Sequence, residues 1–303
     1  MEKIYSLSFY EDRLKYIILH KNKASWALLN HGEIPLKEGC PNIYTLMWKE
    51  GQQKLFQRTR LRRNHGFITF EGHHTYLNMR KITTLRKINP REIIRYNYEN
   101  LLPILFDKDR FFLEYDIEHF SDNSTEISFM GTPQDRKRAM DRLVNEMNIK
   151  PMSVKPIYKY FGDLLKLHPS LRGNREYALY IDSSNAFINF VLIRKGNPIS
   201  KRTLEINGQL GLNIKNYFYS LDHYSSISDF TMYISNTDPK IETLLRNLIP
   251  QNLYTSAQRV HELLAESLGF IQAAQEQYLN YQHCFLSLGR VMPIEAWKRK
   301  SKA

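Results

Sequence analysis

The side chains that could do chemistry in this chain are scattered rather than grouped. The densest acidic segment holds Asp107, Asp109, Glu114, Asp116 and Glu118. Glu114 and Asp116 alternate along an expected strand over residues 111–117, so they share one face and could act as paired carboxylates in acid–base catalysis. A strand face turned to solvent or to a basic partner accounts for the same pattern, and we favour that interpretation.

No spacing typical of a metal site or a catalytic nucleophile is present in the sequence. The adjacent His73 and His74 would point to opposite sides of a strand, so we expect them in an exposed turn rather than on a shared metal. The sequence contains no His-x-x-x-His, Cys-x-x-Cys, Gly-x-Ser-x-Gly or P-loop pattern. Two distant cysteines, Cys40 and Cys284, predict structural thiols in a reducing cytosol rather than a disulfide scaffold.

Bulk properties predict a folded protein of about two domains. The chain has 303 residues, of which 42% are hydrophobic and 24% are charged. Its apolar runs are far shorter than the ~20 residues that span a bilayer, and the first residues form a strand pattern rather than a signal peptide. We therefore expect a cytoplasmic protein without a membrane span of its own.

The formal net charge of +12 favours a polyanionic partner. The densest basic run comprises Lys54, Arg58, Arg60, Arg62 and Arg63. It lies where a helix over about residues 42–60 should end, a place where cations complement the helix dipole. A docking patch for a membrane surface or an acidic partner is the alternative. Because no known nucleic-acid-binding motif accompanies the run, we expect no specific nucleic-acid binding.

Two segments, residues 4–23 and 177–196, repeat one design. The pattern of each segment predicts a strand, a polar turn, a second alternating strand and a basic turn. A third strand is expected directly after each segment. A three-stranded meander used twice predicts two lobes of like topology. We place lobe one at residues 1–168 and lobe two at 175–303, with a linker between them. Such lobes usually bind a ligand or partner between them or on one of them.

The remaining pattern supplies further elements in each lobe. In lobe one, the strands are expected at 67–70, 75–79, 111–117, 126–130 and 152–154, and the helices at about 90–103, 133–147 and 156–167. In lobe two, the strands are expected at 230–234 and 252–254, and the helices at 209–221, from 239, 256–275 and 285–291. The helix after Thr132-Pro133 has strong start signals and a buried stripe. That stripe comprises Ala139, Met140, Leu143, Val144 and Met147.

This order of elements resembles that of the PilM family of type IV pilus assembly proteins, which belongs to the actin/FtsA-like group of two-lobed ATPase folds. The resemblance covers nearly the whole chain and is carried by segments 32–36, 67–77, 96–106, 127–133, 231–234 and 285–290. It implies a mixed α/β, two-lobed actin-like (ribonuclease H-like) fold with an inserted subdomain at about residues 62–155. Since Glu205-Ile206-Asn207-Gly208 passes almost directly to a helix, the fourth subdomain is expected to be reduced.

The same resemblance identifies the positions that hold nucleotide in actin-like ATPases. These proteins use two Asp-x-Gly hairpins and a glycine-rich turn, in which the carboxylate positions magnesium and the glycine lets backbone amides approach a phosphate. The corresponding residues here are Ser8, Tyr10, Asp182, Ser184, Ser235 and Asn236. A serine cannot replace a carboxylate on magnesium, and Tyr10 places a ring where the backbone must be bare. We therefore expect no ATPase activity, no nucleotide cofactor and no metal.

The resemblance also implies a partner. It predicts a non-catalytic scaffold that binds the cytoplasmic N-terminal tail of a PilN-like single-pass membrane protein, in a lobe-one groove between residues 4–36 and 67–130. The assembly ATPase and the anionic membrane surface are further expected partners. Two alternatives remain open: an active actin-like ATPase with diverged loops, and a basic nucleic-acid-binding protein of the competence apparatus.

Overall fold

The computed structural model describes most of the chain. The described residues are 3–22, 25–38, 44–57, 64–72, 75–83, 92, 110–120, 124–167, 175–184, 186–221, 230–235, 239–255, 257–268 and 275–289. Apart from Glu92, the predicted helix at 90–103 lies outside them, as do the linker at 168–174, the pair His73-His74, Cys40 and Asn236.

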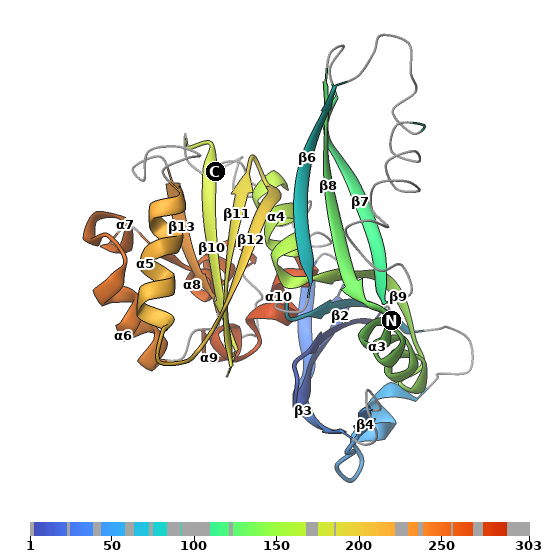
Figure 1. Ribbon diagram of the computed structural model, residues 1–303. Coiled ribbons are helices and arrows are strands. Elements are labelled where there is room, and N and C mark those ends of the chain that lie inside the picture. Colours follow the sequence, from blue (N-terminus) through green and yellow to red (C-terminus); the bar gives the residue numbers. More distant parts are fainter. Residues whose placement is uncertain are drawn as a thin grey trace.

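The first sheet has six strands in the order β4-β3-β2-β1-β5-β9 (Figure 1). Its strands are β1 (Lys3–Phe9), β2 (Arg13–Asn22), β3 (Ser25–Glu38), β4 (Tyr44–Leu46), β5 (Asn64–Phe70) and β9 (Ile149–Pro156). The antiparallel pairs β1–β2 and β2–β3 form the first predicted meander, which is confirmed. β5 then lies parallel to β1, and β9 lies parallel to β5.

The second sheet has eight strands in the order β14-β13-β10-β11-β12-β6-β8-β7. Five of them come from the C-terminal half: β10 (Tyr177–Ser183), β11 (Phe187–Arg194), β12 (Asn197–Glu205), β13 (Phe230–Ser235) and β14 (Gln258–Arg259). β10, β11 and β12 form the second predicted meander, and β13 lies parallel to β10 as β5 does to β1. The sequence repeat is therefore a repeat of topology.

The segment predicted as an inserted subdomain is shared between the two sheets. Its outermost strands, β5 and β9, belong to the first sheet. Between them, β6 (Tyr76–Thr83), β7 (Phe111–Phe120) and β8 (Ser124–Pro133) form a projecting antiparallel blade (Figure 1). This blade joins the second sheet because β6 pairs with β12 at Asn78 and Ser200. The blade is therefore hydrogen-bonded to β12, which follows its first strand, β6, by more than a hundred residues in the sequence.

Helices cover both faces of each sheet. α3 (Gln134–Glu146) packs its predicted stripe on one face of the first sheet, next to Tyr5, Leu7 and Ile18. α5 (Leu210–Leu221), α6 (Pro239–Leu248) and α7 (Gln251–Thr255) pack on one face of the second sheet, and α8 (Val260–Leu268) lies on the other. Residues 206–209 alone separate β12 from α5, which agrees with the predicted direct passage at the place of the fourth subdomain.

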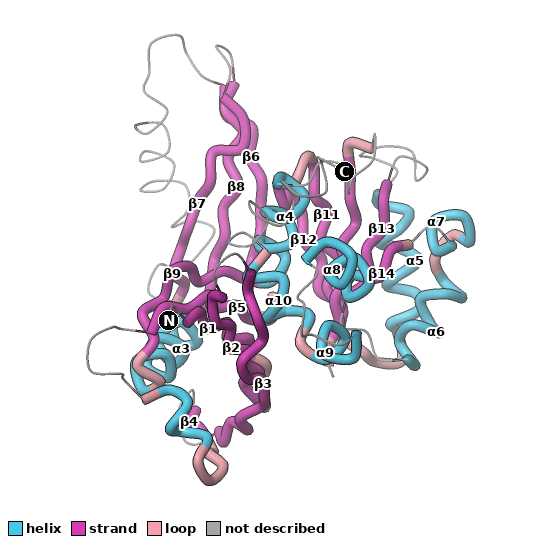
Figure 2. The backbone as a smooth tube through the Cα atoms, turned by 180° about the vertical axis from the view of Figure 1, so that it is seen from behind, coloured by secondary structure: helices cyan, strands magenta, loops and turns pink. Residues whose placement is uncertain are grey.

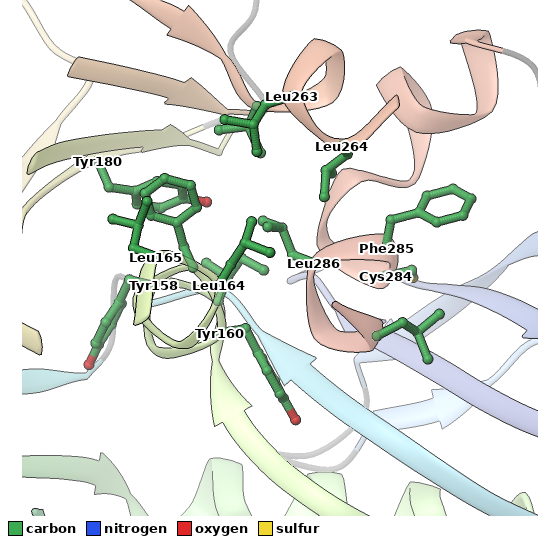
Figure 3. Packing of buried hydrophobic residues seen from close by; sticks show 14 of the residues in the cluster. Tyr158, Tyr160, Leu164, Leu165, Tyr180, Leu263, Leu264, Cys284, Phe285 and Leu286 are labelled. Atoms are coloured by element: carbon green, nitrogen blue, oxygen red, sulfur yellow. The ribbon is translucent and has the colours of Figure 1, made fainter. Parts of the chain in front are cut away.

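The two sheets are joined by a shared hydrophobic core. α4 (Ile157–Leu167), α9 (Gln275–Asn280) and α10 (Gln282–Leu288) supply much of it, and Figure 2 shows α4 and α10 between the sheets. Figure 3 shows Tyr160 and Leu164 of α4 beside Leu286 of α10, with Tyr180 and Leu264 around them. The core also holds Ile17 and Phe67 of the first sheet and Val191 and Tyr233 of the second. Because one cluster serves both sheets, they are held in a fixed arrangement.

Three predicted elements need correction. The helix expected at 256–275 begins only at Val260, after residues 258–259, which form β14 beside β13. Residues 44–56 form β4 and the 3-10 helix η1 (Gln52–Phe56) rather than one long helix, because Gly51 has a φ of 75°, a left-handed conformation that ends a helical run. Residues 252–254 belong to α7 rather than to a strand. The Pro250 carbonyl accepts the N–H groups of Leu253 and Tyr254, which starts a helix. Among the described residues, no helix is both long and apolar enough to cross a membrane.

Candidate functional site in the central cleft and the side pocket

A cavity of about 540 Å³ opens between the two sheets, and we call it the central cleft. It lies where the turn after β1 faces the turn after β10, the pair of positions that the sequence repeat predicts to correspond. Its lining includes Tyr10, Arg13, Lys15, Glu71, Ser183, Ser184, Glu242, Arg259, His261 and Gln282. The parallel neighbours β5 and β13 end at the same place, so four strand ends converge on it.

Asp182 at the end of β10 is held by α10. His283 Nε2 donates to Asp182 Oδ1 at 2.9 Å, and the side chains of both residues are at most 3% exposed. His283 Nδ1 is buried and has no hydrogen-bond partner among the described residues. A carboxylate this far from water requires a donor, because its unpaired burial is costly. Asp182 therefore has its donor inside the protein.

Tyr10 covers the other side of His283. The two rings stack at a centroid distance of 5.3 Å with an interplanar angle of 2°. Burial raises the pKa of Tyr10 well above its usual value, so the phenol stays neutral. The sequence predicted that Tyr10 would occupy space needed by a phosphate. In the structure its ring lies against α10, a helix that the sequence did not connect with this site.

The other predicted positions also meet around α10. Ser8 is fully buried in β1, beside Ser6, whose hydroxyl donates to the Cys284 carbonyl at 2.9 Å. Ser235 at the end of β13 donates to Gln282 Oε1 at 3.1 Å. Ser184 closes the β10–β11 turn by accepting the Phe187 N–H at 3.2 Å. Except for Asn236, which lies outside the described residues, the structure brings the predicted positions to one place.

Each described lysine and arginine of the central cleft is close to a carboxylate. Arg13 lies 2.7 Å from Asp12 and 3.3 Å from Glu33. Lys15 lies 3.4 Å from Glu33 and also donates to the Asn280 carbonyl at 2.9 Å. In the same way, Arg259 pairs with Glu242. A polyanionic ligand in this cleft would have to compete with these internal ion pairs.

Glu71, which follows β5, is a further functional candidate that the sequence analysis missed. It is 6% exposed and lies at the base of the central cleft. Burial, reinforced by the nearby carboxylate of Asp182, raises the pKa of Glu71 to about 8. At neutral pH the carboxyl is therefore mostly protonated. The residues around Glu71 in the sequence do not indicate that its side chain is buried, because the burial arises from the packing of β5 against the rest of the fold.

The central cleft as built is a poor match for a magnesium-bound triphosphate. Such a ligand needs an accessible carboxylate for the metal and bare backbone amides for the phosphates. Asp182 is already bonded to His283, and the turn after β1 presents the Tyr10 ring. Neither turn contains a glycine, since their sequences are Tyr10-Glu11-Asp12 and Ser184-Asn185-Ala186.

A second cavity, which we call the side pocket, lies within the predicted lobe one. It has a volume of about 40 Å³ and is mostly apolar. Its lining comprises Phe9, Tyr10, Leu36, Tyr44, Phe70, Glu71, Thr75, Thr132, Pro133, Arg136, Ala139, Met140 and Leu143. It therefore opens between β1 and β3 on one side and β8 and α3 on the other. Tyr10 and Glu71 line both cavities and form the wall between them.

Comparison with known proteins identifies the architecture. The chain is similar to the solved structure of a PilM-PilN type IV pilus biogenesis complex, with 14% identity, a TM-score of 0.62 and coverage of 94% of this chain and 96% of that chain. The chain has a mixed α/β, actin-like ATPase fold. No protein-family model and no curated protein sequence matches it.

The chain is also similar, more weakly, to two further solved structures. One is a Bacteroides thetaiotaomicron VPI-5482 protein with an actin-like ATPase fold and unknown function, at 11% identity and a TM-score of 0.49, covering 85% of this chain and 90% of that one. The other is the cytoplasmic domain of EpsL, an inner-membrane component of the type II secretion system of Vibrio cholerae. It has 8% identity and a TM-score of 0.44 and covers 78% and 84% of the two chains.

Proposed function

We propose that this protein is a non-catalytic, actin-like scaffold of a type IV pilus or competence-pseudopilus assembly platform. It binds the N-terminal tail of a PilN-like single-pass membrane protein on the cytoplasmic side of the inner membrane. The similarity to the PilM-PilN structure supports the partner class. A shared fold alone does not establish a function, so the proposal depends on the site.

The observation that carries the proposal is the contrast between the two cavities. In the central cleft, α10 binds the residues at the nucleotide positions through the Asp182–His283 pair and the Tyr10 stack. The side pocket is small, apolar and edged by a few polar groups, which suits one small apolar side chain of an extended peptide. The protein thus offers a peptide site in lobe one and an internally bonded cleft in place of a nucleotide site.

The size of the side pocket suggests a direct test. A volume of about 40 Å³ holds about three atoms of the size of a water molecule. Ala139→Met adds three non-hydrogen atoms to a residue that lines this pocket. We expect it to fill the cavity and weaken tail binding at least about tenfold, which corresponds to ~1.4 kcal/mol.

The matched control is Arg138→Met, which places the same side chain on the exposed face of α3. Binding is measured by calorimetry with a synthetic peptide that copies the N-terminal tail of the single-pass membrane protein encoded beside this chain. The control should bind the peptide as the unmodified protein does. Absence of binding by the unmodified protein, or equal binding by both variants, would contradict the proposed site.

A further inference from the structure

Lys201 of β12 reaches out of the second sheet to the loop that follows β5. Its Nζ donates to the backbone carbonyls of Gly72 and Thr75 and lies 3.4 Å from the Thr75 hydroxyl. The neighbouring residue, Ser200, is the one that pairs with β6 at Asn78. A lysine from the C-terminal half thus holds a loop that precedes it by more than 120 residues.

Gly72 and Thr75 are hydrogen-bonded to each other. The Thr75 N–H donates to the Gly72 carbonyl at 3.0 Å, and the Thr75 hydroxyl donates to the same oxygen at 2.7 Å. The Thr75 hydroxyl also lies 3.0 Å from the Tyr158 hydroxyl of α4. A Cβ on Gly72 would lie 2.8 Å from the Tyr158 ring, so the turn is pressed against α4 with no space to spare. Gly72 and Thr75 are therefore held next to each other and against α4.

This turn carries part of the side pocket. Glu71 immediately precedes it and Thr75 ends it, and both residues line the pocket wall. Contacts that hold the backbone at Gly72 and Thr75 therefore also position these two lining side chains. The ammonium group of Lys201, from the second sheet, donates to the carbonyls of Gly72 and Thr75. Because Gly72 and Thr75 are buried, this group takes the place of water there.

The environment of Lys201 agrees with a structural contact of this kind. Burial lowers the pKa of Lys201 to about 7, and the group is nevertheless surrounded by three oxygen acceptors. A buried ammonium gains most from such acceptors, because charge-assisted hydrogen bonds are stronger than neutral ones. Arg202, the next residue of β12, is exposed and provides a comparison on the opposite face of the strand.

We propose that Lys201 is a positioning residue for the side pocket: it fixes the Gly72–Thr75 turn, so that tail binding in the first half of the chain depends on β12 of the second half. This inference rests on the proposed function, since it assigns a role at the same site. It makes the contact between the two halves part of the partner-binding surface. The affinity of the side pocket for its partner then depends on how the two sheets are placed relative to each other.

The test compares Lys201→Met with Arg202→Met in the full chain. Each substitution removes one cation from adjacent residues, but Lys201→Met alone removes the donors to the turn. Hydrogen–deuterium exchange of amides 71–77 reports the turn without any ligand. Calorimetry with the synthetic tail peptide, well below the unfolding temperature, reports the pocket. If Lys201→Met does not fold, Lys201→Ala, which also removes the donors and leaves room for water, takes its place.

We expect faster exchange at 71–77 and an approximately tenfold weaker peptide affinity (~1.4 kcal/mol) in Lys201→Met, with both unchanged in Arg202→Met. Unchanged exchange overturns the role of Lys201 whether or not the peptide binds. Faster exchange with unchanged affinity overturns it as well, because the turn would then be irrelevant to the pocket. Failure of the unmodified protein to bind the peptide is a different result, which overturns the proposed function on which the inference rests.

Discussion

Removal of the imidazole of His283 should destabilise the protein more than most single substitutions. In the structure the contacts of this ring include a 2.9 Å hydrogen bond to the buried Asp182 carboxylate and a stack on Tyr10. A hydrogen bond to a charged group is worth about 1.5–3 kcal/mol, and an aromatic stack about 0.5–1.5 kcal/mol. We therefore expect His283→Ala to lower the free energy of unfolding by about 2–5 kcal/mol.

The contribution of the pair itself is measured with a double-mutant cycle. Asp182→Asn keeps the shape of the side chain and removes its charge, and it is combined with His283→Ala. Urea unfolding of the four proteins gives the coupling free energy, which we expect to be about 1–3 kcal/mol, since residues in direct contact in one network couple in this range. Effects that add to within about 0.5 kcal/mol would refute the reasoning, because His283 would then only fill space beside Asp182.

Two further predictions concern the neighbourhood of the cleft and the junction of the sheets. The pKa of Glu71 is raised from 4.5 to about 8, so the folded state keeps a proton that the unfolded state releases between these values. The free energy of unfolding contributed by Glu71 therefore falls as pH rises, by up to about 1.4 kcal/mol per pH unit. Glu71→Gln should gain stability relative to the unmodified protein as pH rises through this window, and a parallel pH dependence would contradict the burial of a protonated carboxyl. At the junction, a Cβ on Gly162 of α4 would lie 2.6 Å from the Gly196 carbonyl, so Gly162→Ala should destabilise by at least about 1 kcal/mol despite its better helix propensity. Gly211→Ala in α5, where the nearest atom is 3.6 Å away on Leu248, should instead stabilise in the same urea assay, and equal effects of the two substitutions would contradict the close packing of α4.

Much of the fold could be predicted from the sequence, because many of its strands and helices follow from patterns of neighbouring residues. Both meanders, α3 with its buried stripe, and the order β9-α4 follow from alternation, proline starts and apolar periodicity. The connection of the blade to β12 was not readable, because a pairing such as Asn78 with Ser200 leaves no trace in either segment alone. The helix expected at 42–60 is interrupted at Gly51, which has a left-handed conformation, and Trp48 and Phe56 on either side of it pack in the core of the first sheet.

Part of the candidate site could be predicted from the sequence because it lies at the ends of predicted strands. The positions Ser8, Tyr10 and Asp182 lie at strand ends that a repeated topology must bring together. Their partners on α10 come from the C-terminal region, more than a hundred residues after Asp182 in the case of His283. A histidine in a short apolar helix predicts burial, but nothing in its sequence context identifies the carboxylate that it bonds. Glu71 and Lys201 were missed because their burial results from contacts between the two sheets.

In the proposed function, the side pocket binds a partner tail, whereas α10 of the protein itself contacts the residues of the central cleft. The most direct measurement is a calorimetric titration of the full chain with the synthetic tail peptide, in the absence and in the presence of magnesium and ATP, with an ATP titration alongside. We expect saturable peptide binding with the same affinity in both conditions and no saturable heat from ATP. Saturable ATP binding that changes or is required for peptide binding would contradict it.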